Sequence, residues 1–460
     1  MQKVQDIDRW LEQLASKGHE REIALQFIKN MPVAEVGEIL QHLDNELAVD
    51  VLSTLQPSLQ GLVFAELDIA RAIDFFHHVS KRRFAIIFEN IPSDTRADIF
   101  QHLLKEDQTA LLPYLKKATR ENVLHLSAYP PESAGGIMST DFANIEEALT
   151  CSEAIDKIRS DAPSNKMLYN IYVVDDDMKL LGVLSLKDVV LASPTTPVSN
   201  IVNRELVFAY IDEDREVVAE RIEKYELVAI PIINNDMQLL GIVLQDDAID
   251  VIRAEQTEDM EKFMGIVPGK EVLNYAQTSV LDHFKKRVVW LSTLAVIGLL
   301  SGMIIHKYEE AMSALIILAL YMPMVADTGG NTGSQAATVV IRAMALGQIS
   351  LKNWFFVIFK ELRISLLLAL VLGVIAFGKI LFLSWETDIP AAYNLFYIAT
   401  GISFALSIQV ITSTIIGASL PLIVKKFGGD PAVAASPAIT TLVDVTGLLI
   451  YFGMATLFFF

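Results

Sequence analysis

A single carboxylate, Asp444, lies inside the long apolar segment that ends the sequence. Thr440 and Thr441 precede it by four and three residues, so a helix would place both hydroxyls on the face of the carboxylate. An isolated charge at bilayer depth costs at least ~2.5 kcal/mol, and such residues usually face protein or a water-filled path. The spacing predicts a strip of oxygen ligands inside the membrane. The alternative is a buried Asp that is hydrogen-bonded to a neighbouring helix.

A second polar segment, residues 323–335, interrupts another apolar stretch and contains Asp327 and three glycines. Asn331 and Gln335 are four residues apart, which is a helical spacing. Polar groups at this depth are tolerated only against protein or a watery cavity, so we expect these two amides to line a pore. The glycines fit pore lining or close helix packing equally well. Oxygen ligands with one carboxylate suit a hydrated hard cation, above all Mg²⁺, while Ca²⁺, Mn²⁺ and Co²⁺ stay open.

A third group of carboxylates follows the apolar run that ends near residue 244. At 100° per residue, these acidic side chains would cover about half the circumference of one helix: Asp247, Asp250, Glu255, Glu258 and Asp259. One interpretation is a solvated acidic face. The other is a sensor, in which cations bridge these carboxylates to acids elsewhere, such as Asp212, Asp214 and Glu216. Because the helix leads toward the first apolar span, its position could gate a pore.

Charge divides the 460-residue chain near residue 285. Residues 1–284 contain 48 acidic and 26 basic residues, whereas residues 285–460 contain 8 and 11. A net charge of −22 on the first part argues against nucleic acid as a partner and favours cations, although solubility alone explains it equally well. One cysteine, Cys151, excludes an internal disulfide and thiolate metal clusters. The N-terminus lacks an apolar signal core, so we expect residues 1–284 not to be exported.

The apolar segments of residues 285–460 are long enough to cross ~30 Å of hydrocarbon as helices. We predict five transmembrane helices, near 288–307, 312–342, 355–383, 391–424 and 432–458. The uncharged run 389–424 exceeds one span and leaves room for a re-entrant or interfacial stretch. With five spans, the basic loops all fall on one side, which places the acidic half in the cytosol and the C-terminus outside.

The acidic half contains two different patterns. Residues 1–128 alternate short amphipathic segments with Pro or polar turns, which is typical of a helical superhelix. Residues 171–184 match residues 230–243 at an offset of 59, and each copy predicts a strand, a turn, a second strand and a helix. This repeat looks like a tandem CBS pair, a regulatory α/β module. No Walker A motif is present in the sequence, which agrees with passive transport.

Together these motifs resemble the MgtE family of bacterial Mg²⁺ channels over essentially the whole chain. The resemblance is carried by residues 129–135, the repeat, residues 327–335, Asp430-Pro-Ala and residues 444–451. It implies a multi-domain homodimer in the bacterial inner membrane, with one pore lined by the second and fifth spans. The implied parts are a helical N domain at 1–128, a CBS pair at 129–252, a connecting (plug) helix at 253–284 and a five-helix transmembrane domain at 285–460.

The resemblance also implies roles for single residues. Asp444 would be the pore carboxylate for hydrated Mg²⁺, and Asp430 would lie at the cytosolic mouth. Ser436, where family members often carry Asn, would change the inner mouth. Cytosolic Mg²⁺ would close the channel at carboxylates from the CBS pair, the connecting helix and the N domain: Asp214, Glu216, Glu226, Asp247, Asp250, Glu255, Glu258, Asp259, Asp94 and Asp98. A CBS nucleotide signature, Ser185, Lys187 and Asp188, makes ATP a candidate regulator at the first copy.

The sequence therefore predicts a channel for passive Mg²⁺ influx that cytosolic Mg²⁺ closes. An inside-negative potential would supply roughly 2.3 kcal/mol per charge per 100 mV, and about twice that for Mg²⁺. The alternative is an ion-coupled exchanger that uses the same pore carboxylate. A CBS-regulated membrane enzyme is disfavoured, because no nucleophile–base pair or H-E-x-x-H motif is found among the spans.

Overall fold

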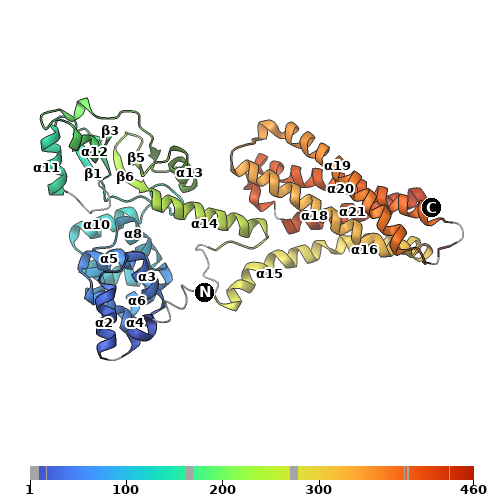
Figure 1. The fold of residues 1–460 in the computed structure, drawn as a ribbon, viewed down its shortest axis with the longest axis horizontal. Coiled ribbons are helices and arrows are strands. Elements are labelled where there is room, and N and C mark those ends of the chain that lie inside the picture. The colour runs from blue at the N-terminus through green and yellow to red at the C-terminus, as the bar shows by residue number, and fades with distance from the viewer. Residues whose placement is uncertain are drawn as a thin grey trace. The chain divides into compact units, whose positions relative to one another are not determined.

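The computed structural model describes residues 10–16, 18–161, 169–269, 278–387, 389–390, 393–434 and 436–460. The chain forms two compact units, Met1–Ile252 and Arg253–Phe460. The first unit holds a helical domain and two small sheets, and the second holds the long apolar helices (Figure 1).

Short helices build the first part of the N-terminal unit, in blue to cyan in Figure 1. Prolines begin or precede several of them: Pro57 is the first residue of one helix, and Pro32 and Pro92 are the N-cap residues of two others. Proline is favoured there because the first helical N–H groups need no partner. The elements are α2 His19–Ile28, α3 Val33–His42, α4 Asn45–Thr54, α5 Pro57–Ala65, α6 Ile69–His78, α7 Lys81–Phe88, α8 Ser93–His102, α9 Lys105–Leu111, η1 Leu112–Tyr114 and α10 Lys117–Leu126. The predicted helical N domain is confirmed.

Phenylalanines fill the core of this helical domain. Phe64, Phe75, Phe76, Phe84 and Phe88 are at most 1% exposed. Phe64 and Phe76 both meet the Phe84 ring edge to face, with ring centroids 5.7 Å and 4.9 Å apart. Such contacts stabilise aromatic pairs beyond the burial of their surface. The domain therefore has its own hydrophobic core.

Two three-stranded sheets repeat one topology, in which a parallel pair is extended by an antiparallel strand. Ile171 pairs with Leu184, and Ile230 pairs with Val243, again at the offset of 59. The elements are β1 Ala143–Glu146, α11 Cys151–Asp161, β2 Asn170–Val174, β3 Leu180–Ser185, α12 Leu186–Leu191, η2 Val198–Asn200, β4 Ala209–Tyr210, α13 Arg215–Tyr225, β5 Ala229–Ile233, β6 Leu239–Leu244 and α14 Gln245–Phe263. The predicted repeat of strand, turn, strand and helix is confirmed.

The second unit contains helices joined by loops and no strand in its described part, and it begins within α14. Its further elements are α15 Val280–Ile297, α16 Leu299–Lys307, α17 Glu309–Ala314, α18 Ile317–Ala345, η3 Leu351–Asn353, α19 Trp354–Leu383, α20 Leu395–Lys426, η4 Pro431–Val433 and α21 Ser436–Phe459. Four segments are long and apolar enough to cross a membrane: Val280–Lys307, Leu351–Leu383, Leu395–Lys426 and Ser436–Phe459. The structure thus supports four of the five predicted spans by length and composition. The fifth, α18, has 29 residues but carries polar side chains along its length.

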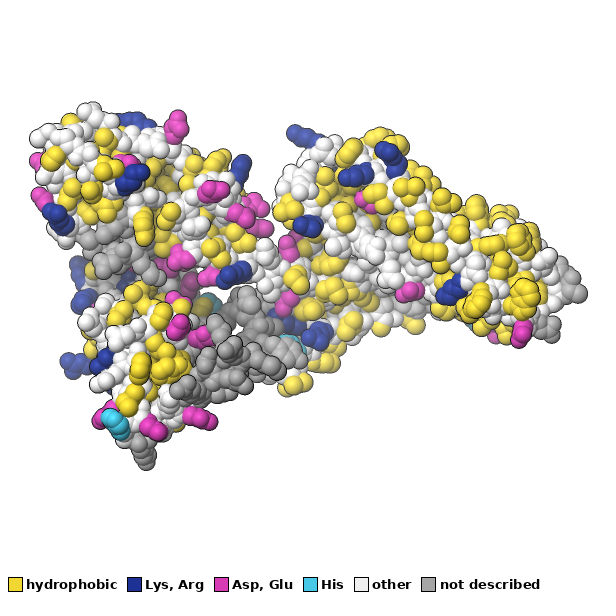
Figure 2. Space-filling model, viewed as in Figure 1, with side chains coloured by type: hydrophobic (Ala, Val, Ile, Leu, Met, Phe, Trp, Pro, Cys, Tyr) yellow, Lys and Arg dark blue, Asp and Glu magenta, His cyan; other side chains and the backbone are white. Residues whose placement is uncertain are grey.

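Two details of the membrane helices differ from the sequence predictions. The interpretation of 389–424 as partly re-entrant is wrong for its described helix, because Leu395–Lys426 is one continuous helix with Pro421 inside it. The polar segment 323–335 is likewise continuous helix despite its glycines. On the visible face, hydrophobic side chains cover much of the membrane helices (Figure 2), and on α19 Leu367, Leu370 and Val374 are at least 66% exposed. Such a surface suits lipid.

Candidate metal sites and nucleotide cavity

Glycines allow α18 to pack closely against α20 and α21. A Cβ atom added to Gly417 of α20 would lie 2.0 Å from the Gly333 carbonyl oxygen of α18. One added to Gly330 would lie 3.0 Å from the Thr440 methyl group of α21. Gly329, Gly330 and Gly333 are all buried, so the structure places them in helix packing, one of the two roles considered for them.

Hydroxyl groups of α18 and α21 lie along the contact between these two helices, on the side that leads to Asp444. Ser436 Oγ donates to Ser334 Oγ at 3.0 Å, and Ser334 Oγ lies 3.4 Å from Thr440 Oγ1. Thr440 and Thr441 also donate to carbonyl oxygens one turn earlier in α21. Asp444 is half-buried one turn beyond Thr440, and its carboxylate has no hydrogen bond or ion pair within the described part of the chain. The alternative of an Asp bonded to a neighbouring helix therefore has no support among the described residues.

A polar stripe runs along the outer face of α18. Asp327, Asn331, Gln335 and Thr338 are all exposed in the single chain, although the helix lies among apolar spans. Asn331 Nδ2 donates to Asp327 Oδ2 at 3.3 Å. Carboxylates and amides are too costly to leave against lipid. The stripe needs a water-filled path or another protein surface, and pore lining by Asn331 and Gln335 stays a prediction.

A lysine that the sequence prediction missed joins the end of α14 to the loop before α21. Lys262 Nζ lies 2.8 Å from Asp430 Oδ2 and 2.7 Å from Glu258 Oε1. Burial alone would lower the pKa of Lys262, but the two carboxylates raise it above its ordinary value. Burial and the Asp430 charge raise the pKa of Asp259. A fixed positive charge thus lies among three of the predicted metal ligands.

Three predicted carboxylates come together in the first unit, from α8 and the start of α14. Burial and the charge of Asp94 raise the pKa of Asp98 to about 7 and that of Asp247 to about 8. Burial and the charge of Asp141 raise the pKa of Asp94. Asp94 Oδ1 and Asp247 Oδ2 are buried without a hydrogen-bond partner among the described residues. The group repels itself unless a proton or a cation neutralises it.

Other predicted ligands are not brought together. Asp214 caps α13 by accepting a hydrogen bond from the Glu216 N–H at 2.8 Å. Glu226 ends the same 11-residue helix in the left-handed conformation, with φ of 52°. These ends are ~16 Å apart, since a helix rises 1.5 Å per residue. In the ranges that the structure describes, no three His, Cys, Asp or Glu side chains converge on one point to hold a metal ion.

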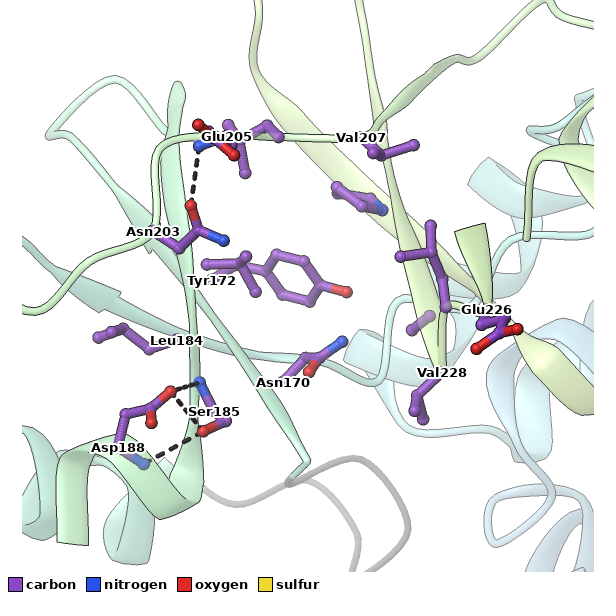
Figure 3. Close-up of a pocket in the computed structure, with 15 residues that line it drawn as sticks. Asn170, Tyr172, Leu184, Ser185, Asp188, Asn203, Glu205, Val207, Glu226 and Val228 are labelled. Carbon is purple, nitrogen blue, oxygen red and sulfur yellow. Dashed lines mark hydrogen bonds between the residues drawn. The ribbon is translucent and has the colours of Figure 1, made fainter. Parts of the chain in front are cut away.

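A cavity of about 370 Å³ lies between the two sheets of the CBS-like repeat (Figure 3). Ser185 and Asp188 line it, and Ser185 Oγ caps α12 by accepting a hydrogen bond from the Asp188 N–H at 3.1 Å. Lys187 is exposed and does not line the cavity. Tyr172, which the sequence prediction missed, is 1% exposed, and its hydroxyl points into the cavity. Burial raises the pKa of that hydroxyl, and its interaction with the Asn170 side chain lowers the pKa in part; no bond of good hydrogen-bond geometry joins the hydroxyl to a described residue. The cavity offers an apolar wall and hydroxyl, amide and carboxylate groups to a ligand.

Family models match three parts of the chain. Residues 322–454 match a divalent cation transporter domain named MgtE, residues 19–132 match the MgtE intracellular N domain, and residues 134–194 and 198–254 match CBS domains. The magnesium transporter MgtE of Thermus thermophilus is 36% identical over 343 residues, which are 75% of this chain and 74% of that protein. The magnesium transporter MgtE of Bacillus subtilis is 36% identical over 333 residues, 72% of this chain and 71% of that protein.

A solved structure also resembles part of the chain. It is the crystal structure of the soluble part of a magnesium transporter, with a TM-score of 0.50 and 27% identity. The match covers 55% of this chain and 98% of that one.

Proposed function

The chain belongs to the MgtE family of magnesium transporters, and from this premise we propose that it conducts Mg²⁺ passively through a pore that cytosolic Mg²⁺ closes. As a member of this family it is a membrane transporter and not an enzyme, with a cytosolic N-terminal domain and apolar C-terminal helices.

The observation that carries the proposal is Asp444. Its carboxylate lies in an apolar helix, and no described residue pairs with it. A carboxylate at this depth needs water or a cation, and Mg²⁺ fits because it keeps most of its water and takes few protein ligands. Ser436, Thr440 and Thr441 supply further oxygen atoms along the same helix. The residues present therefore suit a hydrated ion that passes along α21.

The polar stripe of α18 supports a pore shared by two copies of the chain. Asp327, Asn331 and Gln335 are exposed in one copy, and a second copy would enclose them in a central water-filled path with α21. We count α18 as the fifth span on this ground, since its polar residues would face the path and not lipid. With five spans the C-terminus lies outside the bacterial inner membrane, and the basic loops lie in the cytosol.

Gating would act through the acidic groups of both units. Without Mg²⁺, Asp94, Asp98 and Asp247 repel one another, and so do Glu258, Asp259 and Asp430 where Lys262 does not compensate. Mg²⁺ would bridge them through water and hold the N domain and α14 in the closed arrangement. Asp214, Glu216, Glu226, Asp250 and Glu255 are the further carboxylates proposed for this regulation.

The proposed parts keep the boundaries expected from the sequence: 1–128, 129–252, 253–284 and 285–460. Of the connecting segment, α14 supplies a helix as far as Phe263, and residues 270–277 lie outside the described residues. The cavity beside Ser185 and Asp188 is the proposed site for ATP as a regulator. Its support is the buried Tyr172 hydroxyl, which a nucleoside could satisfy.

Potential-driven uptake tests the channel against the exchanger. The full chain is reconstituted in liposomes that contain a Mg²⁺-sensitive dye, and a K⁺ gradient with valinomycin sets the membrane potential. We expect Mg²⁺ uptake to follow the potential with Na⁺ and pH equal on both sides. Uptake that requires a Na⁺ or H⁺ gradient would instead support the exchanger.

A further inference from the structure

Gln409 is a buried polar residue that the proposed pathway does not use. It lies in the middle of α20, and its side chain is 0% exposed. Its neighbours one turn away and next to it, Leu406 and Val410, belong to the apolar core of the helical unit. An unpaired polar atom in such a place costs ~1–3 kcal/mol, so the amide must contribute something that an apolar side chain could not.

The amide bonds to the pore helix next to the carboxylate. Gln409 Nε2 donates to the carbonyl oxygen of Val443 at 2.9 Å, and Val443 directly precedes Asp444. The Thr446 hydroxyl donates to the same oxygen at 3.1 Å. A carbonyl oxygen has two lone pairs, so the Gln409 amide, the Thr446 hydroxyl and the helical N–H of α21 share its acceptor capacity. Gln409 thereby holds the turn of α21 that carries Asp444.

Two glycines make room for this bond. A Cβ atom on Gly447 of α21 would lie 2.6 Å from Gln409 Nε2, and one on Gly329 of α18 would lie 2.4 Å from it. Real Cβ atoms do not approach so closely, so either methyl group would displace the amide. The side chain of Gln409 therefore occupies the point where α18, α20 and α21 meet.

The direction of the amide is fixed by its partner. Gln409 Oε1 is buried and has no hydrogen-bond donor among the residues that the structure describes. Rotating the amide by 180° would place this oxygen against the Val443 carbonyl oxygen, and two acceptors repel. A methionine or leucine would fill the same space without an unpaired oxygen. The bond to Val443 is thus the feature that distinguishes Gln409 from apolar filling.

We propose that Gln409 is a positioning residue for the cation pathway, because its amide sets the height and rotation of the α21 turn that presents Asp444. This inference rests on the proposed pore role of Asp444. Misplacing a binding group by about 1 Å is enough to weaken its action severalfold or more. Gln409 does not touch the ion and acts only through the backbone of α21.

The test measures Mg²⁺ uptake by reconstituted full-length protein as a function of external Mg²⁺, per amount of folded protein. We expect Gln409→Leu and Gln409→Met to raise the half-saturating Mg²⁺ concentration about fivefold, equivalent to ~1 kcal/mol. Gly447→Ala, which keeps the amide but crowds it, should shift it in the same direction. Ser403→Ala is the matched control: Ser403 is buried on the same helix, its hydroxyl is unpaired within the described residues, and its replacement should leave half-saturation unchanged.

The outcomes separate the inference from the proposed function. If Gln409→Leu and Gln409→Met reduce the amount of folded protein but keep the wild-type half-saturation, Gln409 only packs helices, and the inference is overturned. Unchanged behaviour in both respects overturns it as well. If Asp444→Asn retains wild-type uptake, the proposed function fails, whatever the Gln409 variants do.

Discussion

Replacing Asp247 with Asn should stabilise the packing of α8 against the start of α14, which we take as the closed state of this contact, when Mg²⁺ is absent and the pH is 8. Asp94, Asp98 and Asp247 are half-buried near one another, and burial and like charge both disfavour their ionised forms. Asn keeps the shape of Asp but carries no charge. One source of repulsion is removed without a cavity or a clash.

The magnitude follows from the pKa of Asp247, which is about 8 in the folded protein and 3.8 for the ordinary side chain. One pKa unit corresponds to ~1.4 kcal/mol, so the shift sets an upper limit of ~6 kcal/mol. Neutralising one carboxylate also lets its neighbours relax. We therefore expect Asp247→Asn to stabilise the contact between α8 and α14 by about 2 kcal/mol. The size of the penalty depends on pH: it is absent below about pH 4, grows as the pH rises from the ordinary pKa toward the raised one, and is complete above about pH 8.

Hydrogen exchange of the α8 amides, residues 93–102, measures this opening directly in the full-length protein. After correction for the intrinsic pH dependence, wild type should open more easily at pH 8 than at pH 5. The gain in protection of Asp247→Asn over wild type should be large at pH 8 and small at pH 5. Asp176→Asn, an exposed carboxylate in the turn between β2 and β3, is the control and should change protection by less than ~0.5 kcal/mol.

Added Mg²⁺ completes this experiment. Mg²⁺ that binds only the closed state should raise protection in wild type and do so less in Asp247→Asn, because one ligand is missing. Equal protection of wild type and Asp247→Asn at pH 8 would refute the reasoning. So would a loss of protection in the variant without Mg²⁺, since it would mean that the Asp247 charge stabilises the contact.

Three other substitutions test separate parts of the structure. Lys262→Met removes the cation between Glu258 and Asp430. In patch recordings the variant should require about threefold more cytosolic Mg²⁺ for half-inhibition, because it loses one partly buried ion pair. An unchanged Mg²⁺ concentration for half-inhibition would contradict this role. Tyr172→Phe should weaken ATP binding about fivefold by calorimetry without lowering stability, and undiminished affinity would exclude the hydroxyl from the site. Gly417→Val should cost about 1–3 kcal/mol of stability, seen as a lower thermal midpoint in detergent, because its Cβ would meet α18. Gly378→Ala, with open space around it, should be neutral, and equal effects of the two would contradict the packing.

Local patterns were enough to predict most elements. Prolines at helix starts divide the N domain, and the offset of 59 between the two copies returns as the pairing of Ile171 with Leu184 and of Ile230 with Val243. Long apolar runs predicted the membrane helices, although length alone suggested a re-entrant stretch where α20 is continuous. Helix starts, the repeat and apolar runs depend on residues that are close in sequence, so one sequence is enough to predict them.

The residues missed by the sequence prediction act over long separations. Lys262 meets Asp430 across 168 positions, and no local pattern joins them. Gln409 contacts Val443 across 34 positions and occupies an ordinary place in an apolar helix. Tyr172 belongs to a buried strand, where an aromatic residue first indicates core packing. Such contacts follow from tertiary packing, which composition and periodicity do not specify.

The most direct test of the account is Mg²⁺ flux through Asp444→Asn in potential-driven liposomes, with Asp444→Glu beside it. The account predicts that loss of the charge abolishes Mg²⁺ uptake while the protein still folds and inserts, and that Glu retains part of the flux. Glu386→Gln, outside the helices of the proposed pore, serves as the control and should behave like wild type. Mg²⁺ uptake at the wild-type rate by Asp444→Asn would contradict the central claim that this carboxylate carries the ion across the membrane.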